Sequence, residues 1–456
     1  MSENRKIGAD LTEGRILPLL LRFVLPLLAA NVLQQLYNSV DTMVIGLVEG
    51  SRGTSGVSNG GEVLVFLTFI AISFGSAGQI YVSQLSGAGD RKGITETIGT
   101  LITLMLLMAL VLTVLCLVLC DQVLQWLNCP PEALSQAHDY MMIVSFGLPF
   151  IFGYNALAGL MRGLGESKRP LLFIAVAAVA NVFLDLLLVV VVPLASAGTA
   201  IATAVSEAAA FFSAFIFLYR RREQFGFSLS IEGLRIRPER LKVLMKLGVP
   251  LSAQSAFIHL TQMICTAYIN TFGLAASATN SIGNKLQRLI TVFINSITSG
   301  SGTMVGQNLG AGKTERVKSI VHTTLLCSAV PGIAGALICA FLPAQAFSLF
   351  TKDPEVIELG VSYMHVTLSL MVFSPIQGSF MAVVTGSGNA KLSFLGGMLD
   401  GVVLRLGFSF LLAYGCGMGV LGFFIGNVLA RLGPIGVSMT YYFSGRWKTY
   451  RLLERK

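Results

Sequence analysis

Asn31-Val-Leu-Gln-Gln-Leu-Tyr-Asn-Ser-Val-Asp41 lies within the first long apolar segment of the chain, which runs from about residue 16 to residue 48. The spacing of a helix places Gln34, Asn38 and Asp41 on one face of this segment. If the helix lies in lipid, an ionised carboxylate near mid-depth costs at least ~2.5 kcal/mol. The fold therefore has to give Asp41 a partner, and the rest of the sequence indicates which partners are available.

The composition is that of a polytopic membrane protein. Only 12% of the 456 residues are charged, whereas soluble domains carry about 25%. Apolar runs of the roughly 20 residues needed to cross a bilayer as a helix recur along the chain. We count twelve, centred near residues 32, 70, 107, 148, 181, 208, 259, 292, 330, 371, 403 and 431. The sequence therefore predicts an all-α fold, and the first run is too long for a signal peptide.

The net charge of +9 is explained by membrane topology. Lys and Arg concentrate in one set of loops, including the run from Arg220 to Lys246 and the tail from Arg446, whereas the opposite loops hold only Arg52 and Lys352. The positive-inside rule then places both termini in the cytoplasm. We expect the protein in the plasma membrane. We expect no nucleic-acid partner. The seven cysteines show no metal-ligand spacing.

The two halves of the sequence resemble each other at an offset of 223 or 224 residues. Four landmarks repeat: Pro26 with Pro250, Gln84-x-x-Gly87-Ala88-Gly89 with Gln307-x-x-Gly310-Ala311-Gly312, Gly163-x-Gly165-x-x-Lys168 with Gly386-x-Gly388-x-x-Lys391, and Gly198-x-x-Ile201 with Gly422-x-x-Ile425. Six spans per half give both halves the same orientation, which is typical of alternating-access transporters. The glycine-rich turns lack phosphate-loop spacing, and we expect their glycines to supply positive φ at helix ends.

The repeat predicts the domain organisation. We expect an N-terminal six-helix lobe over 1–219, a cytoplasmic linker over 220–246, a C-terminal six-helix lobe over 247–443 and a basic cytoplasmic tail over 444–456. The two lobes should be related by pseudo-twofold symmetry, and the region between them is the expected substrate chamber.

Oxygen-bearing side chains gather in the membrane runs of the first half. Helical spacing puts Asn181 and Asp185 on one face of span five and Thr199, Thr203 and Glu207 on one face of span six. Span four adds a further polar side chain, that of Asn155. These runs contain no Lys or Arg outside their ends, so a bound cation or a shared proton must neutralise the carboxylates. Hard oxygen ligands suit Na⁺, Mg²⁺ or Ca²⁺ and not zinc or copper.

The second half carries charges of both signs inside its spans. Asp400 is expected to form a structural ion pair with Arg405 or Arg431. His259 is either a hydrogen-bonded packing residue or a proton carrier, and Arg288 lies in span eight beside Lys285. These charges line the expected chamber or serve the fold.

Five groups of residues together resemble the multidrug and toxic compound extrusion (MATE) transporters, closest to their prokaryotic DinF-like branch. They are Leu36-Tyr37-Asn38-x-x-Asp41, Gln84-x-x-Gly87-Ala88-Gly89, Asn155-x-x-x-Gly159-x-x-Arg162-Gly163-x-Gly165, Asn181-x-x-x-Asp185 and Ala202-Thr203. The resemblance covers nearly the whole chain. It implies that Asp41, Asn181, Asp185 and Thr203 hold the coupling ion, with Gln34, Asn38, Asn155 and Thr199 as nearby polar support. The acidic residues that the NorM-like branch carries in spans seven and ten are missing from those spans here.

The resemblance implies a monomeric antiporter that exports organic, often cationic, amphiphilic compounds by alternating access in exchange for Na⁺ or H⁺. Its partners would be the small-molecule substrate and membrane lipid, and it would need no cofactor besides the coupling ion. The alternative is a lipid-linked oligosaccharide flippase of the same superfamily, which Lys285, Arg288 and Arg405 favour and the count of twelve spans disfavours. No sequence motif of a membrane enzyme is present, so we expect no enzymatic activity.

Overall fold

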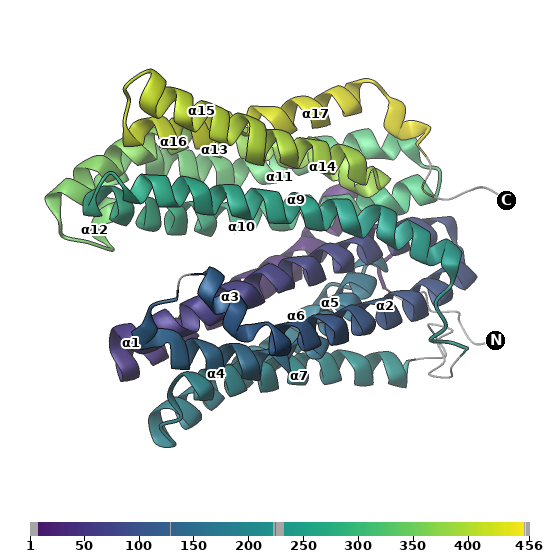
Figure 1. The fold of residues 1–456 in the computed structure, drawn as a ribbon. Helices are drawn as coiled ribbons and strands as arrows, with labels where there is room; N and C mark the ends of the chain where they lie inside the picture. The colour runs from purple at the N-terminus through teal and green to yellow at the C-terminus, as the bar shows by residue number, and fades with distance from the viewer. Residues whose placement is uncertain (1–7, 128, 222–223, 225–231, 451, 453–456) are drawn as a thin grey trace. The chain divides into compact units, whose positions relative to one another are not determined.

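The structure is a computed structural model that describes residues 8–127, 129–221, 224, 232–450 and 452. Within these residues the chain is helical and contains no strand (Figure 1). The helices are α1 (Ile16–Ala88), α2 (Arg91–Val118), α3 (Cys120–Trp126), η1 (Pro131–Ala133), α4 (Leu134–Ser145), α5 (Leu148–Gly163), α6 (Lys168–Asp185), η2 (Leu186–Val191), α7 (Ala195–Arg220), α9 (Pro238–Asn270), α10 (Leu274–Gly310), α11 (Thr314–Phe341), α12 (Pro343–Ser348), α13 (Pro354–Ser387), α14 (Ala390–Met398), η3 (Leu399–Leu406), α15 (Gly407–Phe410), η4 (Leu411–Gly415), α16 (Val420–Leu429), α17 (Leu432–Phe443) and η5 (Arg446–Lys448).

The predicted all-α membrane architecture is confirmed, with a difference in one span. In the described part of the chain, ten helical segments are long and apolar enough to cross a membrane, or eleven if the pair bent by 50° before and after residues 146–147 counts as one. Helix α1 supplies two of them, Ile16–Tyr37 and Gly56–Ala88. The remaining predicted run is α10, which has the length of a span but carries Lys285, Arg288 and many other polar residues.

The two spans of α1 are joined by helical backbone and still approach each other. Val44 and Ile45 form an apolar cluster with Val189 of η2, and both Val40 and Val57 pack against this cluster. In a straight helix the 17 positions between Val40 and Val57 would extend over roughly 25 Å, since each residue adds about 1.5 Å. The chain therefore turns back within α1, between Ile45 and Val57.

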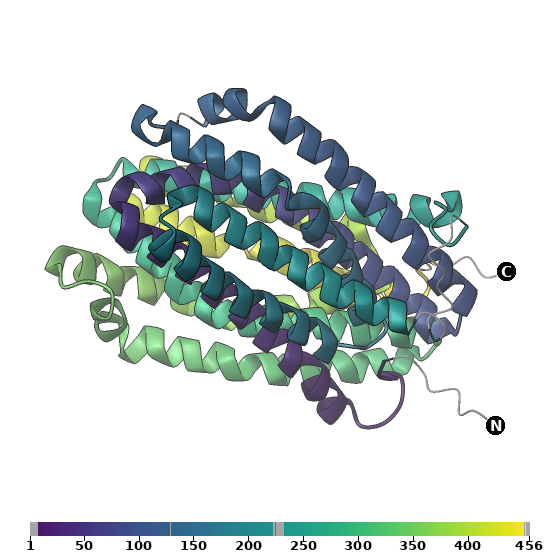
Figure 2. The ribbon, with the colours of Figure 1, turned by 90° about the horizontal axis from the view of Figure 1, so that it is seen from below.

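The chain forms two compact units. The first contains Leu25–Gly248 with the described residues before Leu11, and the second contains Leu11–Val24 and the residues from Val249 onward. Within each unit the long helices pack side by side, as α6 does with α7 and α10 with α13 (Figure 1, Figure 2). Helix α9 begins at Pro238, inside the segment predicted as a linker, where residues 222–223 and 225–231 lie outside the described part.

The start of α9 is held in the first unit by a polar network. Arg240 donates from Nε to Oε2 of Glu96 at 3.0 Å and from Nη1 to the Tyr81 hydroxyl at 2.7 Å. Just before the helix, the Arg237 amide donates to Oγ1 of Thr100 at 3.1 Å. The basic residues at this end of the predicted linker are therefore partly engaged in folding the first unit.

The sequence repeat reappears as a repeat of contacts. A Cβ atom on Gly60 would lie 3.1 Å from the Tyr140 ring, and one on Gly283 would lie 2.3 Å from the ring of Tyr363. The predicted positive φ at the interhelical turns is also found in both halves, with φ of +84° at Gly165 and +77° at Gly388. Each of these pairs is related by 223 positions, so the two halves use the same close packing and the same turns.

A π-helix recurs at the end of span five and of span eleven. In the first unit η2 follows directly after Asp185, and Gly198 packs on the Leu188 carbonyl. In the second unit η4 occupies the related place, and Gly422 packs on the backbone of Leu412 and Ala413. A π-helix makes i→i+5 hydrogen bonds and often marks a functional region. The fold thus places a widened turn directly beside the carboxylate of Asp185.

Candidate functional site

The first unit brings together the four side chains predicted to hold the coupling ion. The carboxyl group of Asp41 on α1 faces the side chains of Asp185, Asn181 and Thr203. Asp41 retains 9% of its exposed surface, whereas Asn181 and Asp185 retain none. Two carboxyl groups thus share an interior location with an amide and a hydroxyl group.

Local structure explains this convergence. Asn181 and Asp185 are one turn apart at the end of α6, so their side chains leave the helix on one face. Helix α7 packs along α6 and carries Thr203. The cluster that joins Val44 and Ile45 to Val189 holds α1 against the end of span five, one turn beyond Asp41.

Most of the carboxylate and amide atoms of this cluster lack hydrogen-bond partners. Within the described part of the chain, Oδ1 of Asp41, both side-chain polar atoms of Asn181 and both carboxylate oxygens of Asp185 are buried and unpaired. Buried polar groups in native proteins are ordinarily hydrogen-bonded, and a desolvated carboxylate is costly. The set therefore fits a cation or a proton that would be shared among these atoms. Among the described residues, no group of three or more His, Cys, Asp or Glu side chains offers an alternative metal site.

Two tyrosines extend the polar cluster. The Tyr37 hydroxyl donates to Oε1 of Glu207 at 3.3 Å, which joins α1 to α7 one turn before Asp41. The Tyr140 side chain of α4 is buried with its hydroxyl facing Thr203. Sequence reasoning missed Tyr140, although its recurrence as Tyr363 at the repeat offset was a usable signal.

The residues predicted as polar support behave differently from one another. Gln34 faces Tyr37, and the backbone carbonyl of Thr199 accepts from Oγ1 of Thr203 at 3.0 Å. Asn155 donates from Nδ2 to the Ile151 carbonyl of its own helix at 2.9 Å, which satisfies that amide locally. The side chain of Asn38 lies outside the described residues.

The second unit contains a buried ion network. Arg405 approaches Asp400 at 2.8 Å between Nη2 and Oδ1, and Arg431 approaches the other carboxylate oxygen at 3.3 Å. Arg405 also donates from Nη1 to Oδ1 of Asn427. Asp400 retains 1% and Arg405 2% of their exposed surface. The predicted structural ion pair is present, and it involves both arginines.

The other charged candidates of the second half are less enclosed. Lys285 and Arg288 are exposed on α10, and the side chain of His259 on α9 is half-buried. Thus Arg405 belongs to the fold of the second unit, whereas Lys285 and Arg288 are available to an external group.

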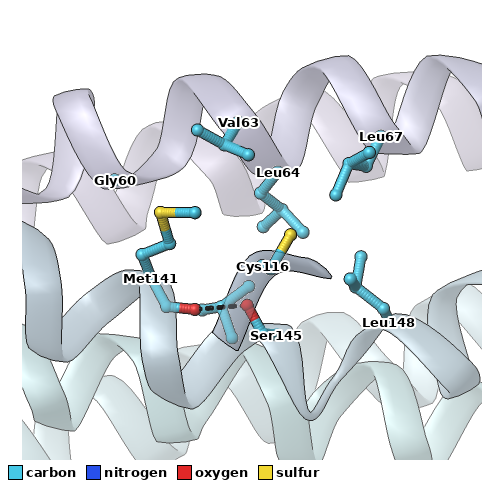
Figure 3. A pocket seen from close by; sticks show the side chains of 9 residues that line it. Gly60, Val63, Leu64, Leu67, Cys116, Met141, Ser145 and Leu148 are labelled. Carbon is cyan, nitrogen blue, oxygen red and sulfur yellow. Dashed lines mark hydrogen bonds between the residues drawn. The ribbon is translucent and has the colours of Figure 1, made fainter. Parts of the chain in front are cut away.

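A small apolar pocket lies in the first unit between α1, α2, α4 and α5 (Figure 3). Leu64, Leu67 and Leu148 contribute to its wall, and the Ser145 hydroxyl donates to the Met141 carbonyl at 2.6 Å. Its lining residues include no carboxylate. This pocket is therefore separate in chemistry from the cluster around Asp41.

Comparisons with known proteins identify the family. The model of the MatE family matches residues 26–187 and 250–398. The chain is 26% identical to the "Probable multidrug resistance protein YpnP" of Bacillus subtilis over 449 residues, 98% of this chain and 99% of that protein. It is 22% identical to the "Multidrug export protein MepA" of Staphylococcus haemolyticus over 392 residues, 86% of each chain.

A solved structure reproduces the fold. It is described as a MOP superfamily transporter from Pyrococcus furiosus, for which "reverse polarity of binding pocket suggests different function". The TM-score is 0.87 at 19% sequence identity, and the alignment covers 100% of this chain and 99% of the other. At this identity the likeness concerns the fold.

Proposed function

Because the chain belongs to the MatE family of multi-pass membrane transporters, we propose that it is an antiporter that exports organic amphiphilic compounds in exchange for Na⁺ or H⁺. The coupling ion binds at Asp41, Asn181, Asp185 and Thr203. The relatives named as multidrug resistance and export proteins support an organic substrate of broad chemistry. The proposed location is the plasma membrane with both termini in the cytoplasm, in agreement with the distribution of Lys and Arg.

The unpaired polar atoms around Asp41 and Asp185 carry this proposal. Two carboxyl groups face each other in the interior with no cationic side chain in their network. Without an added positive charge, both like-charge repulsion and desolvation oppose the approach of α1 to α6. Arrival of one Na⁺ or one proton offsets both costs, so ion occupancy and helix position become linked.

Helix α1 is the element through which this linkage reaches the substrate. Its residues up to Val24 belong to the second unit, and those from Leu25 belong to the first. Pro26 lies beside this boundary and removes one backbone hydrogen bond from the helix. Neutralising Asp41 changes the curvature of α1 around Pro26 and thereby the space available to the substrate.

Efflux from proteoliposomes under imposed gradients tests the proposal. A fluorescent organic cation loaded inside should leave rapidly under one inward gradient, of Na⁺ or of protons, and slowly under the other. Asp41→Asn should remove the gradient-driven component, while thermal unfolding of the purified protein shows that the variant is folded. An efflux rate that depends on neither gradient, or a gradient-driven component that is unchanged in D41N, would refute ion coupling at this site.

The flippase alternative is less well supported. Arg405, one of the three basic residues that favoured it, is buried with Asp400 and Asn427 and so cannot also receive a lipid pyrophosphate. Lys285 and Arg288 are the exposed basic pair. Binding of a lipid pyrophosphate analogue that is lost in K285Q/R288Q, together with absent organic-cation efflux, would favour the flippase.

A further inference from the structure

The second unit contains a counterpart, position for position, of the ion cluster. The offset of 224 residues that relates Pro26 to Pro250 and Gly198 to Gly422 also pairs four cluster residues with residues of the second half. The pairs are Asp41 with Cys265, Asn181 with Arg405, Asp185 with Ser409, and Thr203 with Asn427.

Contacts in the second unit show that these four positions also converge. Cys265 on α9 faces both Arg405 and Ser409, as Asp41 on α1 faces Asn181 and Asp185. Arg405 donates a hydrogen bond to Asn427, which completes the set. The sequence offset therefore identifies two structurally equivalent sites, one in each unit.

The chemistry of the two sites is opposite. The first holds two carboxyl groups, an amide and a hydroxyl, whereas the second holds a thiol, a guanidinium, a hydroxyl and an amide. The neighbouring position is also inverted, because Glu207 of the first half is paired with Arg431 of the second. Where the first site needs a cation, the second already carries one on its own chain.

Asp400 serves as the counterion for this built-in cation. The two offsets of the repeat, 223 and 224, pair it with Ala177 and Val176 of the first half, neither of which carries a charge. Asp400 instead is buried and contacts both Arg405 and Arg431. The second unit thus supplies a counterion for Arg405 from its own chain.

We propose that Arg405 is a tethered cation that permanently fills the second copy of the coupling site, so that each chain binds a single coupling ion, in its first unit. This inference rests on the proposed ion coupling. It adds that the second unit is held in the ion-bound arrangement at all times, and that the cycle is driven by one unit alone.

Ion binding to the purified full-length protein tests the stoichiometry. Equilibrium binding of ²²Na⁺, and proton uptake followed with an indicator in weak buffer, should give one site per chain for whichever ion couples. D41N/D185N should bind none. Two sites in the unaltered chain, or one retained in D41N/D185N, would overturn the inference. A chain that binds neither ion would instead overturn the proposed function.

Exchanging the cations between the units gives a second measurement. N181R places a guanidinium in the first site, and its thermal midpoint should lose the shift that Na⁺ or pH produces, whereas the matched control N181Q should keep part of that shift. Conversely, C265D/R405N/S409D/N427T in the D41N/D185N background should regain one bound ion. An N181R protein that still responds fully to the ion would contradict the tethered-cation role. If the exchanged variants do not fold, the stoichiometry of the unaltered chain decides the question.

Discussion

Arg405 and Asp400 lie 2.8 Å apart, between Nη2 and Oδ1, although they are five positions apart on one helical segment. In an α-helix such residues are about 140° apart around the axis and do not meet. Here both belong to the π-helix η3, whose i→i+5 hydrogen bonds bring positions five apart toward one face. The wider turn is therefore what makes this buried ion pair geometrically available.

Breaking this pair from either side should destabilise the protein. Asp400→Asn removes the carboxylate that both Arg405 and Arg431 contact, at a cost of about 3–5 kcal/mol. Arg405→Met should cost less, because Arg431 still contacts Asp400. The double variant should cost less than the sum of the two, because it leaves no orphaned charge of the pair. Thermal unfolding in detergent measures all three.

An exposed pair of the same length supplies the control. Lys318 Nζ and Glu315 Oε2 also lie 2.8 Å apart, but both side chains are solvent-exposed. Glu315→Gln should leave the thermal midpoint unchanged within error, because solvent screens exposed ion pairs. Equal effects of E315Q and D400N would show that burial does not set the strength of the Asp400 pair.

Thr203 should contribute to ion affinity without being essential for the fold. Thr203→Ala removes the hydroxyl that faces Asp41, and hydrogen bonds to charged groups contribute about 1.5–3 kcal/mol, so affinity should fall about tenfold or more. Ser206 on the same helix is buried and also donates to the carbonyl four residues earlier, that of Ala202, at 2.6 Å, but it is not among the side chains that face Asp41, so S206A should keep the affinity of the unaltered chain. Isothermal titration with the coupling ion distinguishes them, and identical losses would argue against a direct role for Thr203.

The link between Tyr37 and Glu207 predicts an order of stabilities. Tyr37→Phe removes a donor from an interior carboxyl group and should lower the free energy of unfolding by about 1–3 kcal/mol. Glu207→Gln retains a carbonyl acceptor and should be tolerated better. In the E207Q background, Y37F should lower the free energy of unfolding by less than it does in the unaltered chain. An unchanged cost there would mean that Tyr37 acts through other contacts.

Arg240 should anchor the start of α9 to the first unit. Arg240→Met deletes its hydrogen bonds to Glu96 and Tyr81 and should cost about 1–3 kcal/mol. Lys242, two positions later, is exposed, and K242M should have little effect. Limited proteolysis near residues 232–237, together with thermal unfolding, measures the loss of attachment. Equal cleavage of R240M and K242M would contradict the anchoring role.

Sequence reasoning reached a wider polar set through its carboxylates, and the resemblance to the MATE transporters selected Asp41, Asn181, Asp185 and Thr203 from it. Asp41 and Asp185 are carboxylates in apolar runs, and such residues need a compensating partner. Tyr140 breaks no such rule, because a tyrosine in an amphipathic helix is ordinary, and only its neighbours give it a role. The polar character of α10, which carries Arg288, is also hard to predict, because the run around it has the length of an ordinary span.

The pairing of Asp400 with Arg405 depended on a feature that residue patterns do not encode. Helical spacing at 3.6 residues per turn gives Arg405 no advantage over Arg431 as a partner. The π-helix η3 changes the spacing locally and brings Arg405 onto the same face as Asp400. The chemical inversion between Asn181 and Arg405 became visible once contacts fixed which positions of the two halves are equivalent.

The π-helices η2 and η4 carry a historical implication. A π-turn arises when one residue is inserted into an α-helix, and the two halves carry such a turn at related positions, beside Gly198 and Gly422. The simplest ancestry is that a six-helix precursor already had this insertion when its gene duplicated. The turn at η3 has no counterpart, since α6 runs as a regular helix to Asp185, so one of the two halves gained or lost a residue here after the duplication. This change at η3, which brings Asp400 next to Arg405, would then mark the step at which the two halves diverged. The first half kept a site that needs an ion, and the second half acquired a permanent ion pair.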